Sequence, residues 1–113
     1  MNKHDRTRLL DMLDAARKAQ AFAAGRSRED LDSDEMFAFA LTRALEIIGE
    51  AAARVSQETR ADLPQIPWRS IIGMRNKLIH DYIAVDYDIL WATVETELDT
   101  LISHLEKSLE QHS

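Results

Sequence analysis

Four side chains in the segment GMRNKLIHDY, residues 73–82, are of types that can act on a phosphodiester: Arg75, Asn76, His80 and Tyr82. A histidine can take a proton from a ribose 2′-hydroxyl, or give one to a leaving oxygen, near neutral pH. An arginine can hold the phosphate and stabilise charge on its equatorial oxygens, and an asparagine can orient either group. These residue types are therefore suited to the cleavage of RNA.

The spacing of these residues sets a condition on the local structure. Asn76 and His80 are four apart and share a helix face, whereas Arg75 and His80 are five apart, about 140° around the axis. The stretch HDYIAVD is β-branched and turn-prone, so we expect the helix to end near His80. An extended segment would then direct His80 and Tyr82 to the same side. In that case the four side chains can line one polar cleft, and a twofold dimer would supply a second histidine.

Arg75 also has a purely structural interpretation. It continues the apolar series between Ile72 and Ile79, so its stem could pack while its head reaches solvent. A partly desolvated guanidinium needs an acidic partner, for which Glu46 and Glu50 are candidates, or an anion that binds later. A histidine near a helix end, likewise, often caps free carbonyls. Spacing alone leaves the structural and the chemical interpretation open.

Charge is distributed unevenly along the chain. The net charge of −6 argues mildly against a nucleic-acid-binding protein, because phosphate contacts normally come from a basic surface. Residues 54–80, however, hold five basic and two acidic side chains, whereas residues 81–113 hold one basic and eight acidic ones. The segment that contains Arg75 and His80 is therefore the cationic part of an acidic protein, and a local field can act there.

Composition favours a single all-α domain over residues 1–113. The chain has three Gly, two Pro and 6% aromatic residues, together with many good helix formers. The absence of Cys excludes disulfides and Cys-ligated zinc, and no ordered set of His and Asp ligands is present, so neither a metal nor a cofactor is expected. The charged N-terminus does not resemble a signal peptide, and no stretch has the length of a membrane span. We expect a cytoplasmic protein without membrane contact.

Hydrophobic periodicity predicts four helices. They cover residues 5–24, 33–57, 68–78 and the region from 87 onward. Gly25 is the expected stop of the first helix, Ser33 and Asp86 are the expected caps of the second and fourth, and Pro64 and Pro67 bracket a turn. Residues 26–32 are expected to be a charged connection. The seam of the last helix repeats at three and four residues: Trp91, Val94, Leu98, Leu101, Leu105 and Leu109. This pattern predicts a four- to five-helix up-and-down bundle.

The second predicted helix has a second contact face opposite its main apolar stripe. That face comprises Phe39, Thr42, Glu46, Gly49 and Ala53. A glycine inside a helix costs about 1 kcal/mol relative to alanine, so Gly49 indicates that another backbone approaches closely. Homodimerisation is the interpretation we favour, and a loosely packed internal face is the alternative.

The motif segment resembles a known family. RNKLIHDY fits the Arg-x4-His-x-Tyr signature of HEPN-domain proteins, and the chain resembles their HepT-like toxin–antitoxin ribonucleases. RALEIIGEAAARVS, residues 43–56, is similar to the second helix of that family, and residues 63–94 are similar to its third helix and the start of its fourth. The resemblance covers roughly the last two thirds of the chain.

This resemblance implies a HEPN-like helical bundle that forms a homodimer, with the two motifs facing a shared cleft. It implies a metal-independent RNase that acts on tRNA or mRNA, with Arg75 and His80 as the catalytic pair and Asn76 as a supporting residue. Tyr82 would be the tyrosine to which a partner, a minimal nucleotidyltransferase antitoxin, attaches AMP. That group would add bulk and negative charge beside His80, where the RNA phosphate must lie. The alternative is a non-catalytic HEPN dimer that binds the nucleotidyltransferase, since the acidic last segment suits a basic protein partner.

Overall fold

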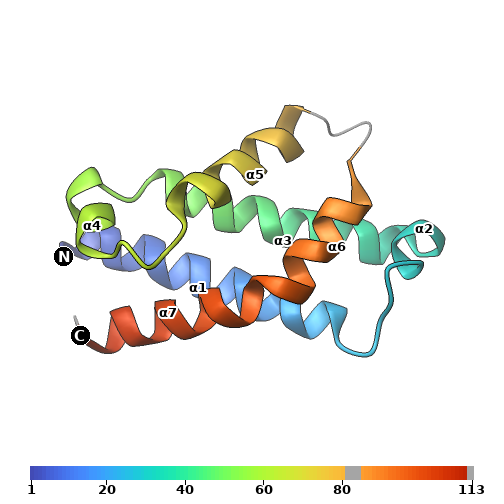
Figure 1. Ribbon diagram of the computed structural model, residues 1–113, viewed down its shortest axis with the longest axis horizontal. Coiled ribbons are helices and arrows are strands. Elements are labelled where there is room, and N and C mark those ends of the chain that lie inside the picture. The colour runs from blue at the N-terminus through green and yellow to red at the C-terminus, as the bar shows by residue number, and fades with distance from the viewer. Residues whose placement is uncertain (81–84, 112–113) are drawn as a thin grey trace.

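The computed structural model describes residues 1–80 and 85–111, apart from the side chains of Ile79 and His80. Every regular element in these residues is a helix, which confirms the all-α fold class. The helices are α1 (Lys3–Ala23), α2 (Asp30–Ser33), α3 (Glu35–Ala53), α4 (Gln57–Asp62), α5 (Trp68–His80), α6 (Tyr87–Thr96) and α7 (Leu98–Gln111). Helix α3 lies lengthwise against α1, α5 packs on α3, and α7 runs along α1 (Figure 1). No helix in the described part of the chain is long and apolar enough to cross a membrane.

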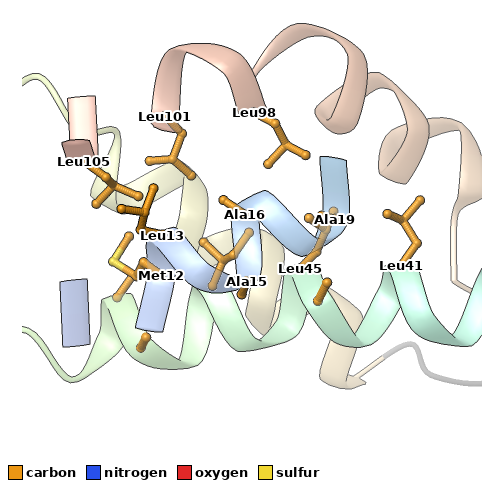
Figure 2. Packing of buried hydrophobic residues seen from close by; sticks show 14 of the residues in the cluster. Met12, Leu13, Ala15, Ala16, Ala19, Leu41, Leu45, Leu98, Leu101 and Leu105 are labelled. Atoms are coloured by element: carbon orange, nitrogen blue, oxygen red, sulfur yellow. The ribbon is translucent and has the colours of Figure 1, made fainter. Parts of the chain in front are cut away.

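The core lies between α1, α3 and α7 (Figure 2). Alanines on α1 face leucines on α3 and α7, and small residues at these positions allow the helix axes to approach. The buried residues labelled in Figure 2 are Met12, Leu13, Ala15, Ala16, Ala19, Leu41, Leu45, Leu98, Leu101 and Leu105. These three helices form the base on which α5 is placed.

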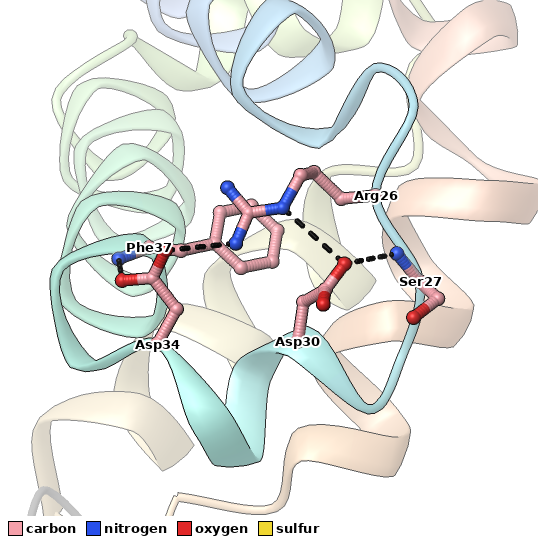
Figure 3. Close-up of polar contacts among 5 residues, drawn as sticks. All are labelled: Arg26, Ser27, Asp30, Asp34 and Phe37. Carbon is pink, nitrogen blue, oxygen red and sulfur yellow. Dashed lines mark hydrogen bonds and ion pairs between the residues drawn. The ribbon is translucent and has the colours of Figure 1, made fainter.

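The region before α3 is more ordered than the predicted charged connection. Residues 30–33 form the short helix α2, and Arg26 ties it to α3 through ion pairs with Asp30 at 3.3 Å and Asp34 at 2.8 Å. The Arg26 guanidinium also lies 4.1 Å from the centre of the Phe37 ring (Figure 3). Asp34, rather than the predicted Ser33, caps α3, because its carboxylate accepts the backbone N–H of Phe37 at 3.1 Å.

Two predicted helices are interrupted. Helix α3 ends at Ala53 rather than near residue 57, because Ser56 caps the short helix α4. The predicted last helix is divided at Glu97, whose φ of −119° and ψ of −27° separate α6 from α7. The apolar spacing runs through this break from Val94 to Leu98, so the sequence pattern gave no sign of it. As a result, α6 leaves the line of α7 (Figure 1).

Asp5 joins the start of α1 to α4 and is fully buried. It accepts hydrogen bonds from the backbone N–H and the hydroxyl of Ser56, at 3.1 and 2.6 Å, and from the hydroxyl of Thr59 at 2.6 Å. Burial by itself would raise the pKa of Asp5. The hydrogen bonds from Ser56 and Thr59, with the nearby His4, hold the pKa below its ordinary value of 3.8. The ionised carboxylate is therefore part of the folded structure.

Asp5→Ala is expected to lower the free energy of unfolding by about 2–4 kcal/mol, because three donors lose a charged acceptor. The contribution of Asp5 is complete above its unfolded pKa of 3.8 and is lost as the pH falls through the lower folded value. Urea unfolding at pH 7 and at a series of acidic pH values measures both effects. Asp14→Ala, an exposed carboxylate of the same helix, should change stability by less than about 0.5 kcal/mol. Equal losses in the two variants would contradict this role for Asp5.

Candidate functional site

Helix α5 approaches α3 most closely where Arg75 crosses Gly49. A Cβ atom built on Gly49 would lie 2.0 Å from Cβ of Arg75, 2.6 Å from its Cγ and 3.2 Å from its Cα. Real Cβ atoms do not come this near to other heavy atoms, so position 49 accommodates only glycine in this packing. Gly49 is buried by this contact. The two helices are therefore set against each other at the base of the Arg75 side chain.

The predicted close approach to Gly49 is confirmed, but the backbone that makes it belongs to the same chain. Gly49 therefore gives no support to a contact between two copies. On the same helix Phe39 is 68% exposed and Met36 is 83% exposed, and no described residue covers them. Homodimerisation stays a prediction. The exposed side chains of Met36 and Phe39 support it, and Gly49 does not.

The Arg75 guanidinium is half-buried and only partly satisfied. Its Nη1 donates a hydrogen bond to Oδ1 of Asn76 at 2.9 Å. Its Nε is inaccessible to solvent and has no hydrogen-bond partner among the described residues. An arginine has five N–H donors, and removing them from water without acceptors is costly. The arrangement leaves Arg75 with donors for an acceptor that comes from outside the described chain.

Glu46 and Glu50, the predicted acidic partners of Arg75, are engaged elsewhere. Both carboxylates bind Nη1 of Arg43, at 3.2 Å and 3.1 Å. These hydrogen bonds, the one to Glu50 being the stronger influence, raise the pKa of Arg43 above its ordinary value. Arg43 is three and seven residues away from them on the same helix, so it reaches both without crossing between helices. In the described part of the chain, Arg75 forms no ion pair.

Of the four residues of the predicted cleft, the structure describes the side chains of Arg75 and Asn76. Arg75 and Asn76 come together through their hydrogen bond, and α5 continues to His80, where the helix was predicted to end. The side chain of His80 and the whole of Tyr82 lie outside the described residues. That all four side chains line one cleft stays a prediction.

The helix that follows the motif is anchored by a residue that the sequence did not single out. Arg28 donates from Nε to Asp88 at 2.7 Å and from Nη1 to Asp32 at 3.0 Å. Its guanidinium also lies 5.8 Å from the centre of the Tyr87 ring. Asp86 caps this helix, α6, as predicted. The chain is thus held at two points around the motif segment: Arg75 packs on Gly49 at its start, and Arg28 binds Asp88 after it.

A pocket of about 270 Å³ lies on the other flank of α5. Its walls come from α3, α5, α6 and α7 and include Met74, Thr93 and His104. Neither Arg75 nor Asn76 lines it. Arg75 therefore lies at the contact between α3 and α5 and not in this largely apolar hollow.

Comparison with known proteins gives a consistent result. The family model described as Ribonuclease HepT-like matches residues 12–108. A Methanocaldococcus jannaschii protein provisionally named an RNase is 34% identical over 94% of this chain and 98% of its own length. A Thermococcus cleftensis protein provisionally named ribonuclease HepT is 37% identical over 95% of this chain and 97% of its own length. A Caldanaerobacter subterraneus protein, also provisionally named an RNase, is 40% identical over 77% of this chain and 78% of its own. No solved structure matches the chain.

Proposed function

We propose that this chain, which belongs to the HepT-like ribonuclease family, is itself an endoribonuclease that cleaves RNA with Arg75 and His80. The observation that carries the proposal is the state of Arg75. Its guanidinium is half-buried, is held beside Asn76 and pairs with no carboxylate among the described residues. An arginine in this state fits an anion that arrives from solvent.

The reaction that these residue types support is an intramolecular transesterification of the RNA phosphodiester. One histidine takes the proton of a ribose 2′-hydroxyl, and the 2′-oxygen forms a new bond to the adjacent phosphorus. The bond from phosphorus to the 5′-oxygen breaks, and that oxygen receives a proton from an acid. The products are a 2′,3′-cyclic phosphate and a free 5′-hydroxyl. Arg75 binds the non-bridging oxygens, whose charge grows in the transition state, and Asn76 orients Arg75. No step requires a metal ion.

We propose that the active form is a homodimer. A single histidine cannot serve as base and acid within one step, whereas two copies bring two His80 residues to one cleft. The exposed Met36 and Phe39 on α3 are a candidate contact for the second copy, since exposed apolar side chains that cluster mark interaction surfaces.

We further propose that the protein is the toxin of a toxin–antitoxin pair, whose antitoxin is a minimal nucleotidyltransferase. The antitoxin would transfer AMP to the hydroxyl of Tyr82, two residues after His80. The added phosphate would repel the RNA phosphate from the motif, and its adenosine would occupy the same space. The acidic segment 81–113 is suited to contact with a basic partner surface.

The test is cleavage of a mixed RNA pool by the purified full-length protein in the presence of EDTA. We expect fragments that end in 2′,3′-cyclic phosphate and 5′-hydroxyl groups. Intact RNA, with a protein that nonetheless binds the nucleotidyltransferase, would support the alternative of a non-catalytic HEPN dimer. Treatment with nucleotidyltransferase and ATP should stop cleavage by the parent protein but not by Tyr82→Phe, which has no hydroxyl to modify. Equal inhibition of both proteins would contradict the assignment of Tyr82.

A further inference from the structure

The outward face of α5 carries positive charge without negative charge. Arg69, Gly73, Asn76 and Lys77 are spaced by four, three and one residues, so they share an arc of roughly 100° on the helix. All four are exposed. Residues 63–80 contain no Asp or Glu, although the chain has 20 acidic residues. We call these four residues the α5 face.

The two cations of the α5 face are unpaired within the described chain. Neither Arg69 nor Lys77 takes part in any hydrogen bond or ion pair there. Half of the other twelve basic side chains hold a carboxylate, namely Arg8, Arg17, Lys18, Arg26, Arg28 and Arg43. Unpaired cations keep their full attraction for a polyanion, because no neighbouring carboxylate neutralises them.

Gly73 lies at the centre of the α5 face without an internal reason for being glycine. A Cβ built on it would meet no atom within 4 Å, in contrast to Gly49 on α3. Glycine weakens a helix relative to alanine, so its presence here calls for a contact with something outside the described chain. It leaves a gap between Arg69, four residues before it, and Lys77, four residues after it.

We propose that the α5 face is the surface along which the sugar–phosphate backbone of single-stranded RNA runs towards Arg75. This inference rests on the proposed ribonuclease function. Arg69 and Lys77 are eight residues apart, about 12 Å along the axis, so each binds a different phosphate of one strand. The backbone comes close to the helix over Gly73. Asn76 connects the α5 face to the motif through its hydrogen bond from Arg75.

The α5 face determines what kind of contact the RNA makes. It carries no aromatic side chain on which a base could stack and no acid that would accept a hydrogen bond from a base. Contacts with phosphate position a strand but do not read its sequence. The phosphate contacts of Arg69 and Lys77 are therefore independent of sequence.

The test measures binding of a fluorescent 2′-O-methyl RNA oligonucleotide, which lacks the attacking hydroxyl and is not cleaved. Arg69→Ala and Lys77→Ala should each weaken binding severalfold. Each should also reduce the slope of log K against log salt by about 0.7, the value for one phosphate contact on a single strand. Lys3→Ala and Lys107→Ala remove the same charge from exposed, unpaired lysines of the described chain on α1 and α7, and they should change neither quantity. Equal effects in all four variants, or a loss confined to one of the two α5 cations, would overturn the proposal.

Gly73→Ala tests the close approach by itself. We expect a higher thermal midpoint, because alanine favours the helix and meets no neighbour, together with severalfold weaker binding of the same oligonucleotide. A stabilised variant that binds as tightly as the parent would overturn the contact over Gly73.

The failure of this proposal can be told apart from the failure of the ribonuclease assignment. The parent protein could bind the 2′-O-methyl oligonucleotide through Arg69 and Lys77 but leave ordinary RNA intact. That result would contradict the ribonuclease function and support the binding surface. Alternatively, the parent protein could cleave RNA while both alanine variants bind and cleave as well as it does. That result would contradict the α5 face as a binding surface and support the ribonuclease function.

Discussion

Alanine at position 75 or at position 80 is expected to slow RNA cleavage by at least about a hundredfold. A positioned general acid or base contributes about 10²–10⁴ in rate, and a group that stabilises developing charge contributes about 10²–10³. Arg75→Lys should recover little, because a lysine cannot reproduce the planar donors that bind a phosphate and Asn76 together. Initial rates on a labelled RNA with a single cleavage site measure the effect.

The matched control for position 80 is His104→Ala. His104 is a half-buried histidine of α7 that lines the pocket beside α5 and has no proposed part in the reaction. Its removal should leave the rate within about threefold of the parent. If two His80 residues act as base and acid, as proposed, the rate should also rise and then fall with pH. A His80→Ala protein that retains full activity would rule out the histidine mechanism.

Gly49→Ala is expected to lower cleavage by about tenfold to a hundredfold, although Gly49 lies on a different helix from the motif. The new methyl group cannot lie 2.0 Å from Cβ of Arg75, so α5 must move away from α3 and carry Arg75 with it. A displacement of about 1 Å at a catalytic group can cost about a hundredfold in rate. Overpacking costs about 1–3 kcal/mol, of which about 1 kcal/mol is offset because alanine favours a helix. Urea unfolding and cleavage rates measure the two effects.

Two comparisons separate displacement of α5 from general damage to the fold. Gly73→Ala makes the same chemical change on α5 where no atom is near, and it should stabilise the protein by up to about 1 kcal/mol. In an Arg75→Gly background the Cβ and Cγ atoms that block position 49 are absent, so Gly49→Ala should lose most of its destabilising effect. Additive effects of the two substitutions would show that Gly49 acts elsewhere.

Sequence periodicity predicted the long helices because their apolar faces repeat at three and four residues. The sequence also identified Gly49 as a point of close approach, since a glycine inside a helix weakens that helix unless a neighbour needs the space. It could not identify the neighbour, because Arg75 is 26 residues away and the pairing of α3 with α5 depends on the whole bundle. The second contact face of α3 was therefore assigned to a second copy, whereas α5 covers it at Gly49.

The contact between Arg28 and Asp88 could not be predicted for the same reason. Arg28 and Asp88 are 60 residues apart, and Arg28 lies in a stretch whose composition is typical of a solvated connection. Glu46 and Glu50 looked free to pair with Arg75, but Arg43 on their own helix reaches both with less loss of side-chain freedom. Spacing along the sequence shows which residues share a helix face. It does not show which of several possible ion pairs will form when the partners lie on different helices.

The acid-free stretch of α5 within an acidic protein has a consequence for how RNA reaches it. At 0.01 M salt the Debye length is about 30 Å, so an approaching strand senses the net charge of −6 and is repelled. At about 0.15 M the Debye length falls to about 8 Å, so salt screens the repulsion by distant carboxylates. The strand is then attracted mainly by the nearby arginines and lysine. Moderate ionic strength thus removes the long-range repulsion before it screens the short-range attraction. Capture of RNA is expected to be fastest near about 0.15 M salt, and slower both at about 0.01 M and at higher salt, where the attraction is screened too.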